Sequence, residues 1–199
     1  RPRTTLSYLS VAFYGTSEEK LAYRRAINQA HAQVTSTAQS PIQYRGLDPN
    51  LQLWVAACLF WGHLDVYEKL RGPMSKADQA RFYEFAKPLG TTLQVRPDMW
   101  PEDIDAFWQY WNSTLDTIVI PQDVKQWLMQ LVDLRFLGPV ISFAFGSSGR
   151  LLTSGFLHPT IREQMGLPWG PKEERRFKRA IKLLATVNNR LPRTLRQLP

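Results

Sequence analysis

Apolar residues recur along most of the chain at the spacing of amphipathic helices. Over residues 16–34 they follow one another in steps of four, three and four, at Tyr23, Ile27, Ala30 and Val34. Thr16 with Glu19 three residues later forms a capping box, because each side chain bonds a free amide at a helix start. We therefore predict a helix over 16–34 with one buried stripe.

The same periodicity predicts further helices, which begin at capping residues or prolines and end near glycines or prolines. We expect them at about 4–14, 48–71, 75–87, 101–115, 121–131 and 171–191, with loops at 36–47 and 90–100. The Gly-rich segment 138–157 predicts a helix around 140–145, a loop and then a short helix. His158, before Pro159, is expected in a loop.

The first half of the helix over 48–71 is apolar nearly all round, which predicts that it is the central helix. The apolar periodicity also predicts an inward face for three later helices. These faces are Ile104, Phe107, Trp108, Trp111 and Leu115 in 101–115, Val124, Trp127, Leu128 and Leu131 in 121–131, and Phe177, Ile181, Leu184 and Val187 in 171–191. Alternation with period two is almost absent. We therefore predict an all-α fold in which residues 1–199 form a single helical domain.

Composition supports a folded globule, since 44% of the residues are hydrophobic and 12% are aromatic. The single Cys58 excludes an internal disulfide, and one Cys with three scattered His gives no zinc pattern. No apolar run of about 18 residues predicts a transmembrane helix, so we expect a cytoplasmic protein. Because the chain starts at Arg1 rather than Met, we also expect residues upstream of it.

The net charge of +8 comes mostly from one end of the chain. Residues 171–199 hold nine Lys or Arg against Glu173 and Glu174. A basic helix of this kind is either a solvated face or a peripheral contact with an anionic membrane surface. The Trp-rich buried faces and the absence of a compact basic three-helix unit argue against a nucleic-acid partner.

His31 is the residue of greatest chemical interest, because its imidazole projects from the buried stripe of the 16–34 helix. One interpretation is a core histidine that makes one hydrogen bond. The other is a metal or haem ligand, since neutral imidazole tolerates burial and binds iron. No phosphate-binding glycine loop, GxSxG elbow or HExxH motif occurs to suggest another chemistry.

Several blocks of the sequence, in order and with similar gaps, resemble one family. They are R-P-R-T-T, I-N-Q-A-H-A-Q-V, Q-Y-R-G-L-D-P-N-L-Q-L-W-V, L-R-G-P-M-S, F-Y-E-F-A-K-P-L-G, M-G-L-P-W and N-R-L-P. As a set they are similar to the MpaB-type, rubber-oxygenase (latex-clearing protein) catalytic domain.

The resemblance implies an all-helical, globin-like core that holds haem b, with His31 as the proximal ligand of the iron. It implies an oxygenase that uses dioxygen to cleave a carbon–carbon double bond of an apolar, isoprenoid substrate. A haem also needs an apolar slot and cations for its carboxylates. Trp54 and Cys58 are candidates for the slot walls, and Arg24 is a candidate for the rim.

The resemblance also places catalytic candidates at the start of the chain, on the oxygen-binding side. Arg1 and Thr5 match the family's R-x-x-K-T segment, whereas Thr4 stands where the family has Lys. The acidic residue proposed as catalytic base in the family would lie upstream of Arg1.

A second departure concerns the W-V-H-A segment of many relatives, where this chain has Ala56 in place of His. His63, two turns later, is the candidate replacement as a haem-binding residue, with a surface or core role as the alternative. These departures leave a second function open, that of a non-catalytic helical protein which binds an apolar ligand.

Overall fold

Helices account for nearly all of the regular structure in the computed structural model, which describes residues 2–40 and 42–192, with side chains from Leu6 onward. In chain order they are α1 (Pro2–Tyr14), α2 (Ser17–His31), α3 (Pro49–Arg71), α4 (Lys76–Ala86), α5 (Pro88–Thr91), α6 (Ile104–Thr117), α7 (Gln122–Val132), the 3₁₀ helix η1 (Arg135–Leu137), α8 (Pro139–Phe156), α9 (Pro159–Gln164) and α10 (Pro171–Arg190). Within these described ranges there is no β-strand, apart from one isolated bridge between Thr35 and Arg45. The predicted all-α fold is confirmed.

The described chain divides into two compact units. Unit 1 comprises residues 2–64 and 74–111, and unit 2 comprises residues 65–73 and 112–192. The single domain and the likeness to a globin core stay predictions.

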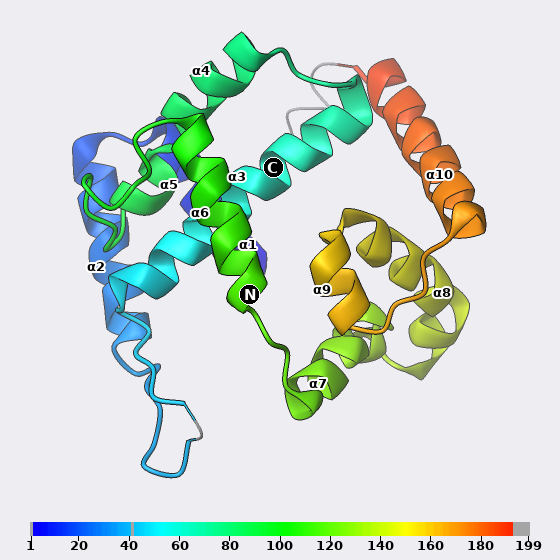
Figure 1. Ribbon diagram of the computed structural model, residues 1–199, viewed down its shortest axis with the longest axis horizontal. Helices are drawn as coiled ribbons and strands as arrows, with labels where there is room; N and C mark the ends of the chain where they lie inside the picture. The colour runs from blue at the N-terminus through cyan, green and yellow to red at the C-terminus, as the bar shows by residue number, and fades with distance from the viewer. Residues whose placement is uncertain (1, 41, 193–199) are drawn as a thin grey trace. The chain divides into compact units, whose positions relative to one another are not determined.

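The core of unit 1 is built from aromatic rings of α3, α4 and α6, the cyan and green helices of Figure 1. Phe60 of α3 lies edge-on to Phe107 of α6 at 4.7 Å and to Tyr83 of α4 at 5.2 Å, measured between ring centroids. Edge-to-face packing suits the charge distribution of aromatic rings. The buried Tyr83 hydroxyl donates to the Pro101 carbonyl at 2.6 Å, so its polar end is satisfied.

The α3 helix buries a continuous face, as the sequence predicts for a central helix. Its buried residues are Gln52, Leu53, Ala56, Ala57, Phe60 and Leu64. It is not buried all round, however, because Val55 is 58% exposed and Leu51 is 46% exposed. The inward face predicted for α6 is confirmed at its centre, where Phe107, Trp111 and Leu115 are buried.

In unit 2, α8 packs against α7, η1 and α10. Phe177 of α10 lies edge-on to Phe156 of α8 at 5.2 Å and sits directly over Gly155. A second cluster, formed by Val132, Met165 and Leu167, joins the end of α7 to the segment around α9. These two contacts hold the helices of the unit around α8.

The prediction for segment 138–157 is wrong, because α8 is one continuous helix. Glycine in a helix normally costs stability, but three of these glycines allow close packing. A Cβ at Gly146 would lie 3.2 Å from the Asp133 carbonyl oxygen, one at Gly149 would lie 3.1 Å from the Leu134 side chain, and one at Gly155 would lie 2.3 Å from the Phe177 ring. The glycines therefore mark close contacts rather than a break.

The predicted inward faces of α7 and α10 are only partly right. Phe177 and Ile181 are buried as expected, but Leu184 and Val187 are each 50% exposed. On α7, Leu128 is half-buried, whereas Trp127 is 59% exposed. Val124 and Leu131 are also exposed.

His158 lies in the short connection between α8 and α9, as predicted, directly before the first residue of α9. Its Nδ1 accepts a hydrogen bond from the Thr160 amide at 3.4 Å, which caps the helix. Burial and the nearby Arg162 guanidinium lower the pKa of His158, and the neutral ring is the form that can accept this bond. No helix within the described ranges combines the length and the apolar character needed to cross a membrane.

Candidate functional site

The α2 helix, which carries His31, starts as the sequence predicts. The Thr16 hydroxyl accepts from the Glu19 amide at 3.2 Å, and the Glu19 carboxylate accepts from the Thr16 amide at 2.7 Å. These bonds lower the pKa of Glu19. The helix ends at His31, three residues earlier than predicted. The prediction of a buried stripe is wrong, because Tyr23 and Ile27 are only half-buried and Ala30 and Val34 are exposed.

The segment around Gly46 holds the C-terminal end of α2 in place. The Gly46 amide donates to the Val34 carbonyl at 2.7 Å, and the Val34 amide donates to the His31 carbonyl at 2.9 Å. A Cβ at Gly46 would lie 2.9 Å from the His31 carbonyl oxygen and 3.0 Å from Cβ of Val34. Only glycine permits this approach without displacing the backbone that carries the imidazole.

The imidazole of His31 is half-buried, and its Nδ1 is buried without a hydrogen-bond partner among the described residues. Buried polar atoms in native proteins nearly always have a partner, so an orphaned ring nitrogen calls for an explanation. The core-histidine interpretation requires one hydrogen bond, and the described residues do not provide it.

A polar network that the sequence analysis missed ties α2 to α3. The Gln94 side chain donates to Asn28 Oδ1 at 2.5 Å and accepts from Arg24 Nη2 at 3.2 Å. The Gln94 backbone amide donates to the buried Gln52 side chain at 3.0 Å, and Gln52 donates to the Gly46 carbonyl at 2.9 Å. The network therefore runs from two turns before His31 to the glycine that contacts its carbonyl.

Arg24, the candidate for the rim, lies on α2 two turns before His31. It is half-buried, bonded to Gln94, and borders a shallow cavity of about 300 Å³ with Lys20 and Thr92. Its bond to Gln94 fixes the direction of the guanidinium. Whether Arg24 binds a haem carboxylate stays a prediction.

The two wall candidates on α3 lie one turn apart on the same side of that helix. Trp54 stacks on Trp111 at 4.9 Å and meets Tyr110 edge-on at 6.4 Å, so α6 already covers much of its ring. Cys58 is half-buried, and burial raises the pKa of its thiol to about 11. A neutral thiol of this kind behaves as a small apolar group.

His63 lies nine residues after Trp54 and therefore on the opposite side of α3. Its ring meets Phe13 of α1 edge-on at 6.1 Å, and its Nδ1 lies 2.6 Å from the Leu59 carbonyl oxygen. Donation from Nδ1 to a carbonyl leaves the lone pair on Nε2. The ring is thus held by its own helix, as the core interpretation expects.

The catalytic candidates Arg1, Thr4 and Thr5 lie outside the described residues, apart from the backbone of the two threonines in α1. Among the described residues, no hydrogen bond, ion pair or ring contact joins His31 to Trp54, Cys58 or His63. His31, Trp54, Cys58 and His63 therefore share unit 1, but none of these interactions joins His31 to the other three. The described residues also hold no group of three or more His, Cys, Asp or Glu side chains that could bind a metal ion.

One signal in the sequence could have revealed the missed network. Gln52 is a lone polar residue in the apolar run L-Q-L-W-V-A-A, and a buried polar side chain requires partners. Its partner Gln94 is 42 residues away in a segment without periodicity, so the pairing itself had no local signature.

Comparison with known protein families identifies the family of the chain. The family model described as "ER-bound oxygenase mpaB/B'/Rubber oxygenase, catalytic domain" matches residues 1–186. The chain belongs to this family. The MpaB/rubber oxygenase family consists of oxygenase catalytic domains, and the match includes His31, the Gln94 network and α3.

Two relatives within the curated proteins extend this result. The uncharacterized proteins Mb2261 of Mycobacterium bovis and Rv2237 of Mycobacterium tuberculosis are each 41% identical to the chain over 192 residues, which is 96% of the chain and 75% of each relative. No solved structure matches the chain.

Proposed function

We propose that this chain is the helical core of a haem-dependent oxygenase that acts with dioxygen on an apolar, isoprenoid substrate. The observation that carries the proposal is the His31 imidazole, whose buried Nδ1 lacks a hydrogen bond at the end of a helix held in place on two sides. Membership of the MpaB/rubber oxygenase family supports the reaction class.

The residues present fit a haem on its proximal side. A haem iron needs a single imidazole from the protein, because the porphyrin supplies four nitrogens. His31 would provide that ligand, Arg24 would bind a haem carboxylate, and Cys58 would add an apolar wall. A thiol with its pKa raised to about 11 stays protonated near neutral pH and so favours the wall over a thiolate ligand.

When bound, the haem supplies the activation of dioxygen. The chain's own residues set the position of the end of α2 that carries the imidazole. Gly46 lets the 44–46 segment contact the His31 carbonyl, and the Gln94 side chain holds Asn28 and Arg24 on the preceding turns. None of these bonds reaches the imidazole, whose Nδ1 has no partner among the described residues, so they position the end of α2 rather than the ring itself. Arg1, Thr4 and Thr5 are proposed to lie on the oxygen side.

The test is an absorbance spectrum of the full chain expressed with ample haem precursor. We expect a Soret band that His31→Ala abolishes or shifts, because that substitution removes the proximal ligand. His158→Ala is the matched control, since it removes another half-buried histidine that is not proposed to bind haem. His63→Ala should also keep the band if His63 only supports α3.

Two results would refute the assignment of His31. One is colourless, iron-free protein, and the other is a spectrum that His31→Ala leaves unchanged. The catalytic half of the proposal is tested separately by oxygen uptake with terpenoid substrates. Haem-loaded protein that consumes no oxygen with any of them would be a binding protein instead.

A further inference from the structure

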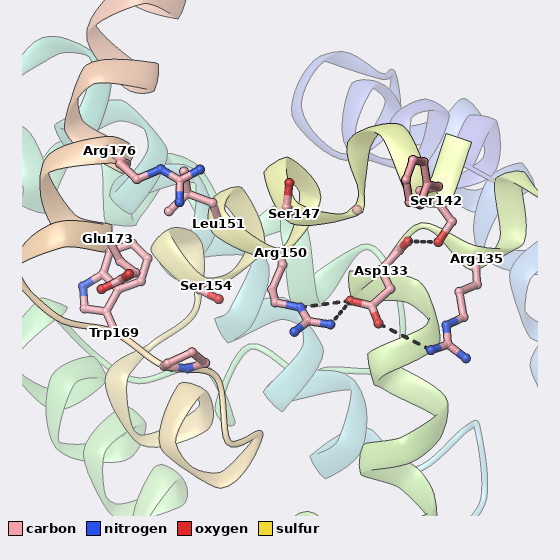
Figure 2. A pocket seen from close by; sticks show the side chains of 13 residues that line it. Asp133, Arg135, Ser142, Ser147, Arg150, Leu151, Ser154, Trp169, Glu173 and Arg176 are labelled. Atoms are coloured by element: carbon pink, nitrogen blue, oxygen red, sulfur yellow. Dashed lines mark hydrogen bonds and ion pairs between the residues drawn. The ribbon is translucent and has the colours of Figure 1, made fainter. Parts of the chain in front are cut away.

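One face of α8 borders a cavity of about 520 Å³ in unit 2 (Figure 2). The lining residues of α8 recur in steps of four, as in Ser142, Gly146 and Arg150, and in the neighbouring row Phe143, Ser147 and Leu151. Residues at this spacing lie on one side of a helix. Small side chains along both rows leave room, and the volume is in the usual range for small-molecule sites.

Charged groups from four elements, α7, η1, α8 and α10, meet at this cavity. Arginines come from η1, α8 and α10, as Arg135, Arg150 and Arg176, and carboxylates come from Asp133 and Glu173. Three guanidinium groups against two carboxylates leave a surplus of one positive charge. A single negative charge on a ligand would balance it.

Both carboxylates are already engaged by the protein. Asp133 Oδ1 accepts from Arg150 Nε at 3.0 Å and Nη2 at 2.6 Å, and the Asp133 carbonyl accepts from the Ser142 hydroxyl at 2.8 Å. The Glu173 carboxylate accepts from the Gly170 amide at 3.1 Å, which caps α10. These bonds fix the acidic groups in place and reduce their ability to neutralise a further cation.

Arg176 is the cation without such a partner. Its side chain is exposed and makes no hydrogen bond or ion pair within residues 6–40 and 42–192. Figure 2 shows it extended from α10 toward Leu151 of α8, on the side of the cavity opposite to the Asp133–Arg150 pair. A guanidinium in this position can bind a carboxylate with two parallel hydrogen bonds.

The rest of the wall contains Ser142, Ser147 and Ser154 as well as apolar side chains. Phe143 is 95% exposed and Leu151 is half-buried. Trp169 donates its Nε1–H to Glu174 at 2.8 Å, and the Arg162 guanidinium lies 4.6 Å from the centre of its ring, so one face of the ring is already covered. Large exposed apolar groups beside a cavity are typical of binding sites. A ligand with one anionic end and one apolar portion would match both parts of the wall.

We propose that this cavity binds a small carboxylate-bearing amphiphile, with the carboxylate at Arg176 and the apolar portion along Phe143, Leu151 and Trp169. The proposal goes beyond the haem-dependent function and does not depend on His31. It assigns unit 2 a binding role of its own.

The probe for this proposal is dansyl-undecanoic acid, a fluorescent carboxylic acid with an apolar chain, titrated into the full chain without added haem. We expect saturable enhancement of its fluorescence and competition by dodecanoate. Methyl dodecanoate, which has the same chain without the charge, should compete at least about tenfold less well, since a charge-assisted hydrogen bond is lost.

Two matched pairs of variants locate the site. Arg176→Gln should weaken probe binding by about tenfold, whereas Arg179→Gln, which removes an exposed cation of the same helix outside the cavity, should change it less than about twofold. Ser147→Leu should fill the cavity and remove binding, whereas Ser148→Leu, at an exposed neighbour that does not line it, should not. Circular dichroism confirms that each variant is folded.

Three outcomes would overturn the proposal. The first is equal competition by the methyl ester, which would make the site purely apolar. The second is an equal effect of Arg179→Gln and Arg176→Gln, or unchanged binding in Ser147→Leu. Either result would show that the probe does not bind in this cavity. The third is dodecyl phosphate competing far better than dodecanoate, which would assign the head group to a phosphate instead.

Discussion

The environment of the Cys58 thiol distinguishes an apolar wall residue on α3 from a thiolate ligand. Cys58 is half-buried on α3, and burial raises its pKa to about 11 because the thiolate loses hydration there. The folded state therefore binds the proton more tightly than the unfolded state, whose thiol has the ordinary value of 9.0. Its contribution to stability is constant below that value and declines as the pH rises from about 9 to about 11.

We expect the folded protein to react slowly with iodoacetamide at pH 8, by about two orders of magnitude relative to an ordinary thiol, because the thiolate is the reactive form. The rate should rise about tenfold for each pH unit until the pH approaches the raised pKa. Mass spectrometry of the intact chain over a pH series measures this. The same reaction in guanidinium chloride is the control, and equal rates in both states would show that the thiol is not shielded.

Individual residues also show what the sequence could and could not reveal about the site. The Thr16–Glu19 capping box and the spacing of the stripe placed His31 on the inward side of α2, since both signals are local. The Gln52–Gln94 bond joins two segments that are far apart in the sequence and could not be predicted from periodicity. His158 lies in the connection where it was predicted, but its role as the cap of α9 was not predicted, because that role depends on the turn that follows it.

At the scale of elements, glycine has different surroundings in two helices: it allows a close contact in α8, whereas it borders open space in α3. A Cβ at Gly155 of α8 would lie 2.3 Å from the Phe177 ring, whereas a Cβ at Gly62 of α3 has no described neighbour within 4 Å. The glycines of α8 predict a break when they are weighed only by the intrinsic helix propensity of glycine. The packing partner that compensates for that propensity lies on α10, more than twenty residues later.

We predict that Gly155→Ala lowers the free energy of unfolding by about 1–3 kcal/mol, since the added methyl group forces α8 and α10 apart. Gly62→Ala should instead raise it by up to about 1 kcal/mol, because alanine is the better helix former and finds open space. Urea unfolding followed by circular dichroism measures both variants. Similar destabilisation by the two substitutions would mean that backbone preference, and not the Phe177 contact, decides the effect.

At the scale of the whole molecule, the positive charge is concentrated on α10. Its exposed face carries Arg175, Arg179 and Lys182, and Leu183 beside them is 65% exposed. A helix with basic and apolar residues on its outer surface is suited to the surface of an anionic membrane. Such a contact would bring the protein to substrates dissolved in lipid.

We therefore expect the chain to co-sediment with vesicles that contain phosphatidylserine, and to be released as the salt concentration rises. Arg179→Glu should weaken vesicle binding by about tenfold or more, because each cation near the surface contributes about 1 kcal/mol. Arg81→Glu on α4 is the matched control, since it changes the net charge equally at another exposed position. Equal losses in both variants, or binding insensitive to salt, would remove α10 as the contact.

The close approach of Gly46 to the carbonyl of His31 gives a criterion for surveying related genomes. A chain that has any larger residue at this position cannot keep the same geometry at the end of α2, so its imidazole has moved or its turn has been rebuilt. One codon could then separate relatives that keep this turn from relatives that have rebuilt it, before any of them is purified.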